Sequence, residues 1–171
     1  MATLTRNARS ARETAPRAKA RAPRRSTGFP IAKVLRDDAG LEDLLRPRNA
    51  MDYVHIVKRG IPARFVDAAV ERFGIPKERF VVLLHTSKPT INRLIHSNRP
   101  LDPLLSGAFK DAARVLEKIR EAVGGDQAAM TEWLNSYVPA LGTKPIDLLD
   151  TPDGRDLVAA TVDRARYGVF G

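Results

Sequence analysis

The feature that most constrains the fold is a run of apolar residues at helical spacing between Asp102 and Val123. Leu105, Phe109, Ala112, Leu116, Ile119 and Val123 recur at alternating intervals of four and three residues, and Leu104, Ala108 and Val115 widen the stripe. This spacing places apolar side chains on one face of an α-helix. Asp102 is a suitable N-cap before Pro103. The segment therefore predicts a long amphipathic helix, whose wide stripe fits a buried core or, alternatively, a dimer interface.

Proline and glycine divide the rest of the chain into shorter segments with the same helical periodicity. Proline is favoured at the first position of a helix and glycine just past its end. No segment alternates with period two for long enough to predict a strand, and the chain is expected to be all-α. The predicted helices run from Asp52 to Gly60, from Pro62 to Gly74, from Pro76 onward, from Asp126 to about Leu134 and from Thr151 to about Tyr167, with one or two short ones between Phe29 and Pro47.

The net charge of +9 is unevenly distributed along the chain. Residues 1–28 carry eight basic side chains and one acidic one, residues 47–105 carry ten and five, and residues 106–171 carry eight and ten. The arginine-rich tail lacks apolar periodicity and is predicted to be disordered; a phosphate-binding arm, a solvated extension and a transit peptide all fit it. The predicted organisation is a tail over 1–28, a helical domain over 29–105 and a C-terminal domain, opened by the long helix, over 106–171.

The segment from Pro76 to His96 has the pattern of a helix-turn-helix. Lys77 to Leu84 supplies the first helix, His85 to Ser87 the turn, and Ser87 a good N-cap for the second helix. His85 is expected to adopt a left-handed backbone conformation, which histidine tolerates better than branched residues do. In the second helix Ile91, Leu94 and Ile95 fall on one inward face.

The polar residues of the second helix and its flanks suit contact with DNA. Asn92 can bond an adenine edge and Arg93 a guanine edge in two places each, whereas Lys88, Thr90 and Arg99 suit phosphates. An ordinary surface helix is the alternative interpretation, and the basic charge of residues 47–105 favours DNA. The predicted DNA-contacting set is Ser87, Lys88, Thr90, Asn92, Arg93, His96 and Arg99.

Several classes of function find no support in the sequence. His55, His85 and His96 lack the spacing of metal ligands, and the chain has no cysteine to join them. No glycine-rich phosphate loop is present, so neither a cofactor nor catalysis is expected. The absence of cysteine fits a reducing, cytoplasmic location, and no apolar run is long enough to span a membrane or to serve as a secretory signal.

The order of motifs resembles a known family of antitoxins. The run from Leu83 to Arg93 is followed by the long helix, by Trp133-Leu134 and by the closing segments 140–155 and 164–170, and this order is similar to that of the Xre/MbcA/ParS family. Such antitoxins pair with RES-domain toxins, which consume NAD. The resemblance covers about residues 50–171 and is more specific in the C-terminal third than in the helix-turn-helix.

The resemblance implies an antitoxin that neutralises a RES-domain toxin by binding it and that represses their shared operon. A homodimer is expected, because two recognition helices about one DNA turn apart read a two-fold site. Trp133 is expected in the core, whereas the end of the last helix is expected to contact the toxin. A free-standing regulator or nucleoid-associated protein is the alternative. The predicted toxin-binding residues are Tyr137, Lys144, Arg164, Tyr167, Gly168, Val169 and Phe170.

Overall fold

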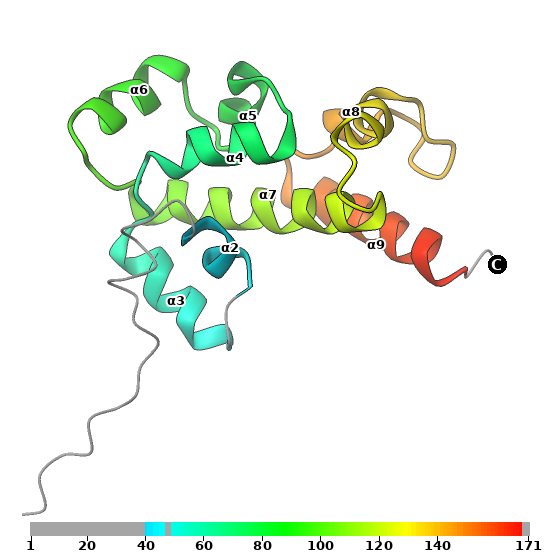
Figure 1. Ribbon diagram of the computed structural model, residues 1–171, viewed down its shortest axis with the longest axis horizontal. Helices are drawn as coiled ribbons and strands as arrows, with labels where there is room; N and C mark the ends of the chain where they lie inside the picture. Colours follow the sequence, from blue (N-terminus) through cyan, green and yellow to red (C-terminus); the bar gives the residue numbers. More distant parts are fainter. Residues whose placement is uncertain (1–39, 47–48, 169–171) are drawn as a thin grey trace, which may run out of the picture.

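The computed structural model describes residues 40–46 and 49–168 and places most of them in helices (Figure 1). Within these residues the only strand-like pairings are two isolated bridges, Pro62 with Pro100 and Val138 with Thr143. The predicted all-α class is confirmed, and the predicted tail over 1–28 lies outside the described residues. The elements are α2 (Gly40–Leu45), α3 (Ala50–Arg59), α4 (Phe65–Phe73), α5 (Lys77–Leu83), α6 (Lys88–His96), α7 (Pro103–Ala122), α8 (Gln127–Asn135), the 3₁₀ turn η1 (Pro145–Asp147) and α9 (Pro152–Tyr167).

The long helix α7 is the central element of the fold. In Figure 1, α4 and α5 lie on one side of α7, α2 and α3 lie on the other, and α9 runs along its C-terminal half. Phe109, Ala112, Leu116 and Ile119 are buried, and the ring of Phe109 meets that of Phe80 edge to face at 5.8 Å. The stripe of α7 is therefore core, as favoured over a dimer interface.

Leu104 corrects the predicted width of this stripe. Its side chain is 83% exposed, whereas Val115, on the same edge of α7, is buried. Helix α9 contacts the later turns of α7, where Arg114 pairs with Asp156 at 3.8 Å and Lys118 pairs with Asp163 at 2.6 Å between nitrogen and oxygen, whereas Leu104 lies in the first turn. Helical spacing predicts which face a residue shares, but coverage of that face depends on where the neighbouring helix begins.

Most of the predicted helix ends are confirmed by cap geometry. Ser87, Asp102, Asp126 and Thr151 each accept a hydrogen bond from a backbone N–H in the first turn of the following helix. These contacts span two or three residues, so the local sequence is sufficient to specify them.

Two predicted starts were wrong. Asn49, not Asp52, caps α3, because the Asn49 Oδ1 accepts from the Asp52 N–H at 3.0 Å. Helix α4 begins at Phe65 rather than at Pro62, because Pro62 is held in the bridge to Pro100. For α3 a nearby polar residue caps the helix in place of the predicted one. For α4 a contact with a distant segment delays the start of the helix.

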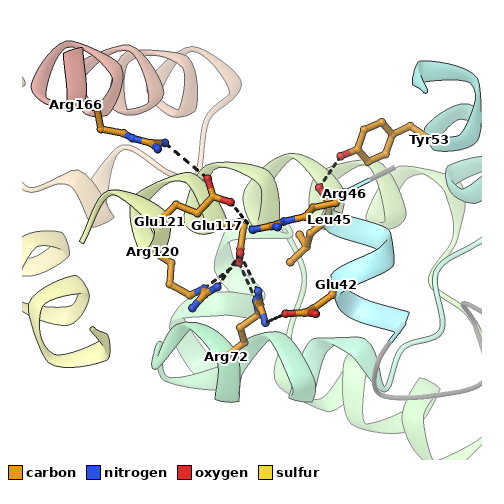
Figure 2. A network of polar contacts seen from close by, with 9 residues as sticks. All are labelled: Glu42, Leu45, Arg46, Tyr53, Arg72, Glu117, Arg120, Glu121 and Arg166. Carbon is orange, nitrogen blue, oxygen red and sulfur yellow. Dashed lines mark hydrogen bonds and ion pairs between the residues drawn. The ribbon is translucent and has the colours of Figure 1, made fainter. Parts of the chain in front are cut away.

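Two glutamates of α7, the buried Glu117 and the partly exposed Glu121, connect it by polar contacts to neighbouring helices (Figure 2). Glu117 of α7, whose side chain is 7% exposed, accepts two hydrogen bonds of 2.8 Å from the guanidinium of Arg72 on α4. It accepts two more, of 3.0 and 3.2 Å, from Arg120. Arg72 also reaches Glu42 of α2 at 3.2 Å. One turn further along α7, Glu121 lies 2.7 Å from the Arg46 guanidinium and 3.7 Å from that of Arg166 on α9.

The ionisation of Glu117 follows from this setting. Burial alone would raise its pKa, but the hydrogen bonds and charges of Arg72 and Arg120 outweigh burial and lower the pKa from 4.5 to about 2. The carboxylate is therefore ionised at all but strongly acidic pH, and its hydrogen bonds connect α4, and through Arg72 also α2, to α7.

Candidate functional site

Helices α5 and α6 form the predicted helix-turn-helix. The turn between them closes through hydrogen bonds from the His85 and Thr86 N–H groups to the carbonyls of Val82 and Val81, at 2.9 and 3.1 Å. His85 has φ of 54°, the left-handed conformation predicted for it. The Ser87 Oγ accepts from the Thr90 N–H, and α6 begins at Lys88. This local geometry presents the outer face of α6 to solvent.

Five of the seven predicted DNA-contacting side chains have partners inside the protein, and two of them, Lys88 and Asn92, reach another helix. Lys88 pairs with Glu78 of α5. The Asn92 Oδ1 accepts from the Lys77 Nζ at 2.8 Å, and the same Nζ lies 2.6 Å from an oxygen of Asp67 on α4. These contacts tie α6 to α5 and α4. They leave the Asn92 amide donor available, but its carbonyl oxygen is already engaged.

The outer face of α6 and the segment that follows it carry the remaining candidates. Arg93, His96 and Arg99 are exposed, and Thr90 is half-buried. The His96 Nδ1 lies 2.7 Å from the backbone carbonyl of Asn92. Neither Arg93 nor Arg99 makes a side-chain hydrogen bond or ion pair with another described residue. Arg93 is thus the best-placed side chain for a base edge, and its contact with DNA stays a prediction.

A fourth basic residue joins this surface from outside the helix-turn-helix. Arg59, the last residue of α3, lines the same hollow as Thr90, Arg93 and Arg99. The sequence interpretation did not include it. A basic residue in the last turn of a helix is ordinarily explained by the helix dipole, so nothing local distinguished Arg59.

Helix α9 exposes a continuous stripe at its solvent side. Leu157, Ala160, Arg164 and Tyr167 are all exposed and recur at intervals of three, four and three residues. Leu157 is 54% exposed and Tyr167 73%. The opposite side of α9 is buried through Val158 and other residues against α7. An exposed stripe that mixes apolar, aromatic and cationic side chains is typical of a protein-binding surface.

The other predicted toxin-binding residues fall in two places. Tyr137, 65% exposed, and Lys144 flank the bridge between Val138 and Thr143 at the base of a loop. Gly168 ends α9 in a left-handed conformation with φ of 65°. Val169 and Phe170 lie outside the described residues. Trp133 is half-buried and packs against the core, as expected for it.

The two candidate surfaces lie far apart. In Figure 1, α6 is toward one end of the long axis, and both the loop after α8 and the end of α9 are toward the other. Arg155, buried at the start of α9, connects the two regions. Its guanidinium donates to the Leu149 carbonyl at 3.0 Å and to the Leu83 carbonyl, at the end of α5, at 3.4 Å. The C-terminal helix is therefore bonded to the backbone just before the turn of the helix-turn-helix.

Metal sites and membrane spans are two kinds of feature that the described part of the chain does not show. Over residues 40–46 and 49–168, no group of three or more histidine, aspartate or glutamate side chains is arranged to hold a metal ion. No helix among the same residues is long and apolar enough to cross a membrane.

Comparison with known proteins matches both regions. Residues 52–108 match the family described as the antitoxin Xre-like helix-turn-helix domain. Residues 118–168 match the family described as the antitoxin Xre/MbcA/ParS C-terminal toxin-binding domain. The chain is also 26% identical over 129 residues to the Prs ADP-ribosylating antitoxin of Sphingobium sp. (strain YBL2), an alignment that covers 70% of this chain and 81% of the relative.

Proposed function

The chain is an antitoxin of the Xre/MbcA/ParS family, and from this premise we propose that it neutralises a RES-domain, NAD-consuming toxin by binding it directly and represses its own operon by binding operator DNA. The name of the Sphingobium relative includes ADP-ribosylation, a reaction that takes its ADP-ribose from NAD. That chemistry supports a partner that consumes NAD. The chain itself contributes no catalysis in this proposal.

The exposed stripe of α9 is the observation that carries the toxin half of the proposal. It lies within the region that matches the toxin-binding domain, and Leu157 and Tyr167 expose apolar area that a partner would remove from water. Buried aromatic and arginine side chains supply most of the affinity of protein interfaces. We infer that the end of α9 covers the mouth of the toxin's active site and excludes NAD by occupying the space it needs.

Truncation tests this mechanism. Deleting residues 167–171 should abolish inhibition of NAD consumption by the toxin, while the remaining chain stays folded because α9 still packs on α7 through Val158 and Val162. Substituting Val82, an exposed apolar residue of α5, by serine is the matched control and should leave inhibition intact. Undiminished inhibition by the truncated chain would refute this placement.

The outer face of α6 supports the DNA half. Replacing Arg93 by alanine should cost about 1–3 kcal/mol of binding to the operator and relax the preference at one base pair, whereas a phosphate contact would affect all sequences alike. Unchanged operator affinity in the Arg93→Ala chain would show that the recognition helix is misplaced.

The proposed homodimer and the toxin partner are tested together by purification. A tagged chain expressed with its neighbouring genes should retain the toxin, and analytical ultracentrifugation of the free chain should give a dimer. Because the stripe of α7 is buried within one copy, a dimer has to use another surface. A free-standing regulator would bind DNA without retaining any partner.

A further inference from the structure

We propose that Arg59 and Arg99 form one binding site for a backbone phosphate of duplex DNA, next to Arg93 and beside the groove that α6 enters. The inference rests on the proposed DNA binding and adds Arg59, which belongs to α3, as a residue that positions the protein on the phosphate backbone. The ligand is a phosphodiester, so the site recognises the position of the duplex rather than its sequence.

The backbone builds this site from two distant segments. After Arg59 the chain turns at Gly60, whose φ is 88°. The Leu101 N–H then donates to the Ile61 carbonyl at 2.7 Å, next to the bridge between Pro62 and Pro100. A side chain on residue 60 would place its Cβ 2.6 Å from the Leu101 carbonyl oxygen. Only glycine permits this close approach, and the approach sets Arg59 beside the Arg99 segment.

A buried hydroxyl fixes the same junction from below. The Ser106 Oγ, fully buried in α7, accepts from the Ile61 N–H at 2.9 Å and donates to the Leu101 carbonyl at 3.2 Å. Both segments are thereby attached to the first turn of α7. The backbone positions of Arg59 and Arg99 are therefore fixed by contacts with the core of the fold. This reduces the entropy lost when their guanidinium groups bind a ligand.

The three arginines surround a hollow of about 410 Å³. None of them makes a side-chain hydrogen bond or ion pair with another described residue. Asp102 is the acidic residue of the hollow, and one of its carboxylate oxygens accepts from the Leu105 N–H at 2.8 Å as the N-cap of α7. Three cations face one carboxylate, so the hollow has a net positive charge.

A phosphate group fits this arrangement. Guanidinium groups present paired donors that match phosphate oxygens. The hollow also lies at the N-terminal end of a 20-residue helix, where the dipole of α7 favours negative charge. Arg93 belongs to α6, so a phosphate held here would lie beside whatever groove α6 enters. This continuity favours a duplex over a free nucleotide.

The test compares the loss of a positive charge at Arg59 with the loss of one at Lys58, the preceding residue of α3. Binding of a fluorescent duplex from the chain's own promoter is followed by anisotropy over a series of salt concentrations. Arg59→Gln should weaken binding about tenfold on promoter and random duplexes alike, and should lower the slope of log affinity against log salt by about 0.9. Lys58→Gln removes the same charge from the preceding, exposed position and should change affinity less than about twofold. Arg59→Lys, which keeps the charge, should recover part of the loss.

Single neutral methylphosphonates in the duplex locate the contact. At one backbone position the substitution should lower the affinity of the unchanged protein for the duplex about tenfold. It should leave the affinity of the Arg59→Gln protein almost unchanged. Equal responses of the Arg59→Gln and Lys58→Gln proteins, with duplex binding intact, would overturn the phosphate site alone. Failure of the unchanged protein to bind any duplex would overturn both the site and the proposed repression. If millimolar inorganic phosphate displaced the duplex and no methylphosphonate changed the affinity, the hollow would be a site for small anions. That result would overturn the proposal that its ligand is a duplex phosphate.

Discussion

Replacing Glu117 by glutamine removes the buried negative charge that pairs with Arg72 and Arg120, while keeping the shape of the side chain. In the folded protein the carboxylate is paired with Arg72 and Arg120, and its pKa is about 2 instead of 4.5. A difference of about 2.5 pKa units corresponds to about 3 kcal/mol of stability at neutral pH. Removing one partner of a buried pair costs a similar amount, so Glu117→Gln should lose about 3 kcal/mol.

The sign of the pH dependence is fixed by the direction of the shift. Because the pKa of Glu117 is lower in the folded than in the unfolded chain, its contribution is complete above about pH 4.5 and is lost as the pH falls toward 2. The difference in unfolding free energy between the unchanged protein and Glu117→Gln should therefore shrink over that range. Urea denaturation at several pH values, followed by circular dichroism, measures it.

The matched control is Glu132→Gln. Glu132 is exposed on α8, and its carboxylate makes no hydrogen bond or ion pair with another residue of 40–46 and 49–168. Its replacement should therefore change stability by less than about 0.5 kcal/mol. A Glu117→Gln protein that loses about 3 kcal/mol equally at pH 7 and pH 2.5 would refute the ionic argument, because the loss would then reflect packing alone.

Four further substitutions test the geometry of the fold. Gly60→Ala should lose about 2–3 kcal/mol of stability, measured by thermal unfolding, because residue 60 has a positive φ and lies against the Leu101 carbonyl. Gly107→Ala, with open space around its Cβ, should instead gain about 0.5–1 kcal/mol. A loss of stability at both positions would contradict this account. Arg155→Met should cost about 1–3 kcal/mol of stability, because the Leu83 and Leu149 carbonyls lose their donor. Hydrogen exchange should also speed up in the turn after α5. An unchanged exchange rate there would show that Arg155 does not hold the turn. Thr151→Ala should cost about 1 kcal/mol through loss of the α9 cap, and equal stability in denaturant would rule that cap out as a contributor.

The helices and most of their ends could be predicted because the interactions that specify them are local. The stripe of α7 and the caps at Ser87, Asp102, Asp126 and Thr151 connect residues that are four or fewer positions apart. The left-handed turn at His85 follows for the same reason, since the chain has only three residues in which to reverse. The family was also accessible, because its closing motif is a continuous run of sequence.

The candidate sites were only partly predictable because their chemistry depends on which side chains meet across the fold. Arg93 could be placed on the outer face of α6 from periodicity alone. The partner of Asn92, however, is 15 residues away in the chain, at Lys77, and Arg59 reaches the hollow only through contacts with residues about 40 positions further on. The stripe of α9 became visible once the opposite side of that helix was known to be buried.

The amino-acid sequence by itself determined the all-helical fold, the helix-turn-helix and the family, since each depends on short-range periodicity, caps or contiguous motifs. Tertiary structure decided the charge pairs. Glu117 binds Arg72, 45 residues away, because α4 crosses α7 at that turn, and Leu104 remains in water because α9 begins further along α7. Ion pairs and burial depend on distances through space, which a helical repeat leaves undetermined until the helices have packed.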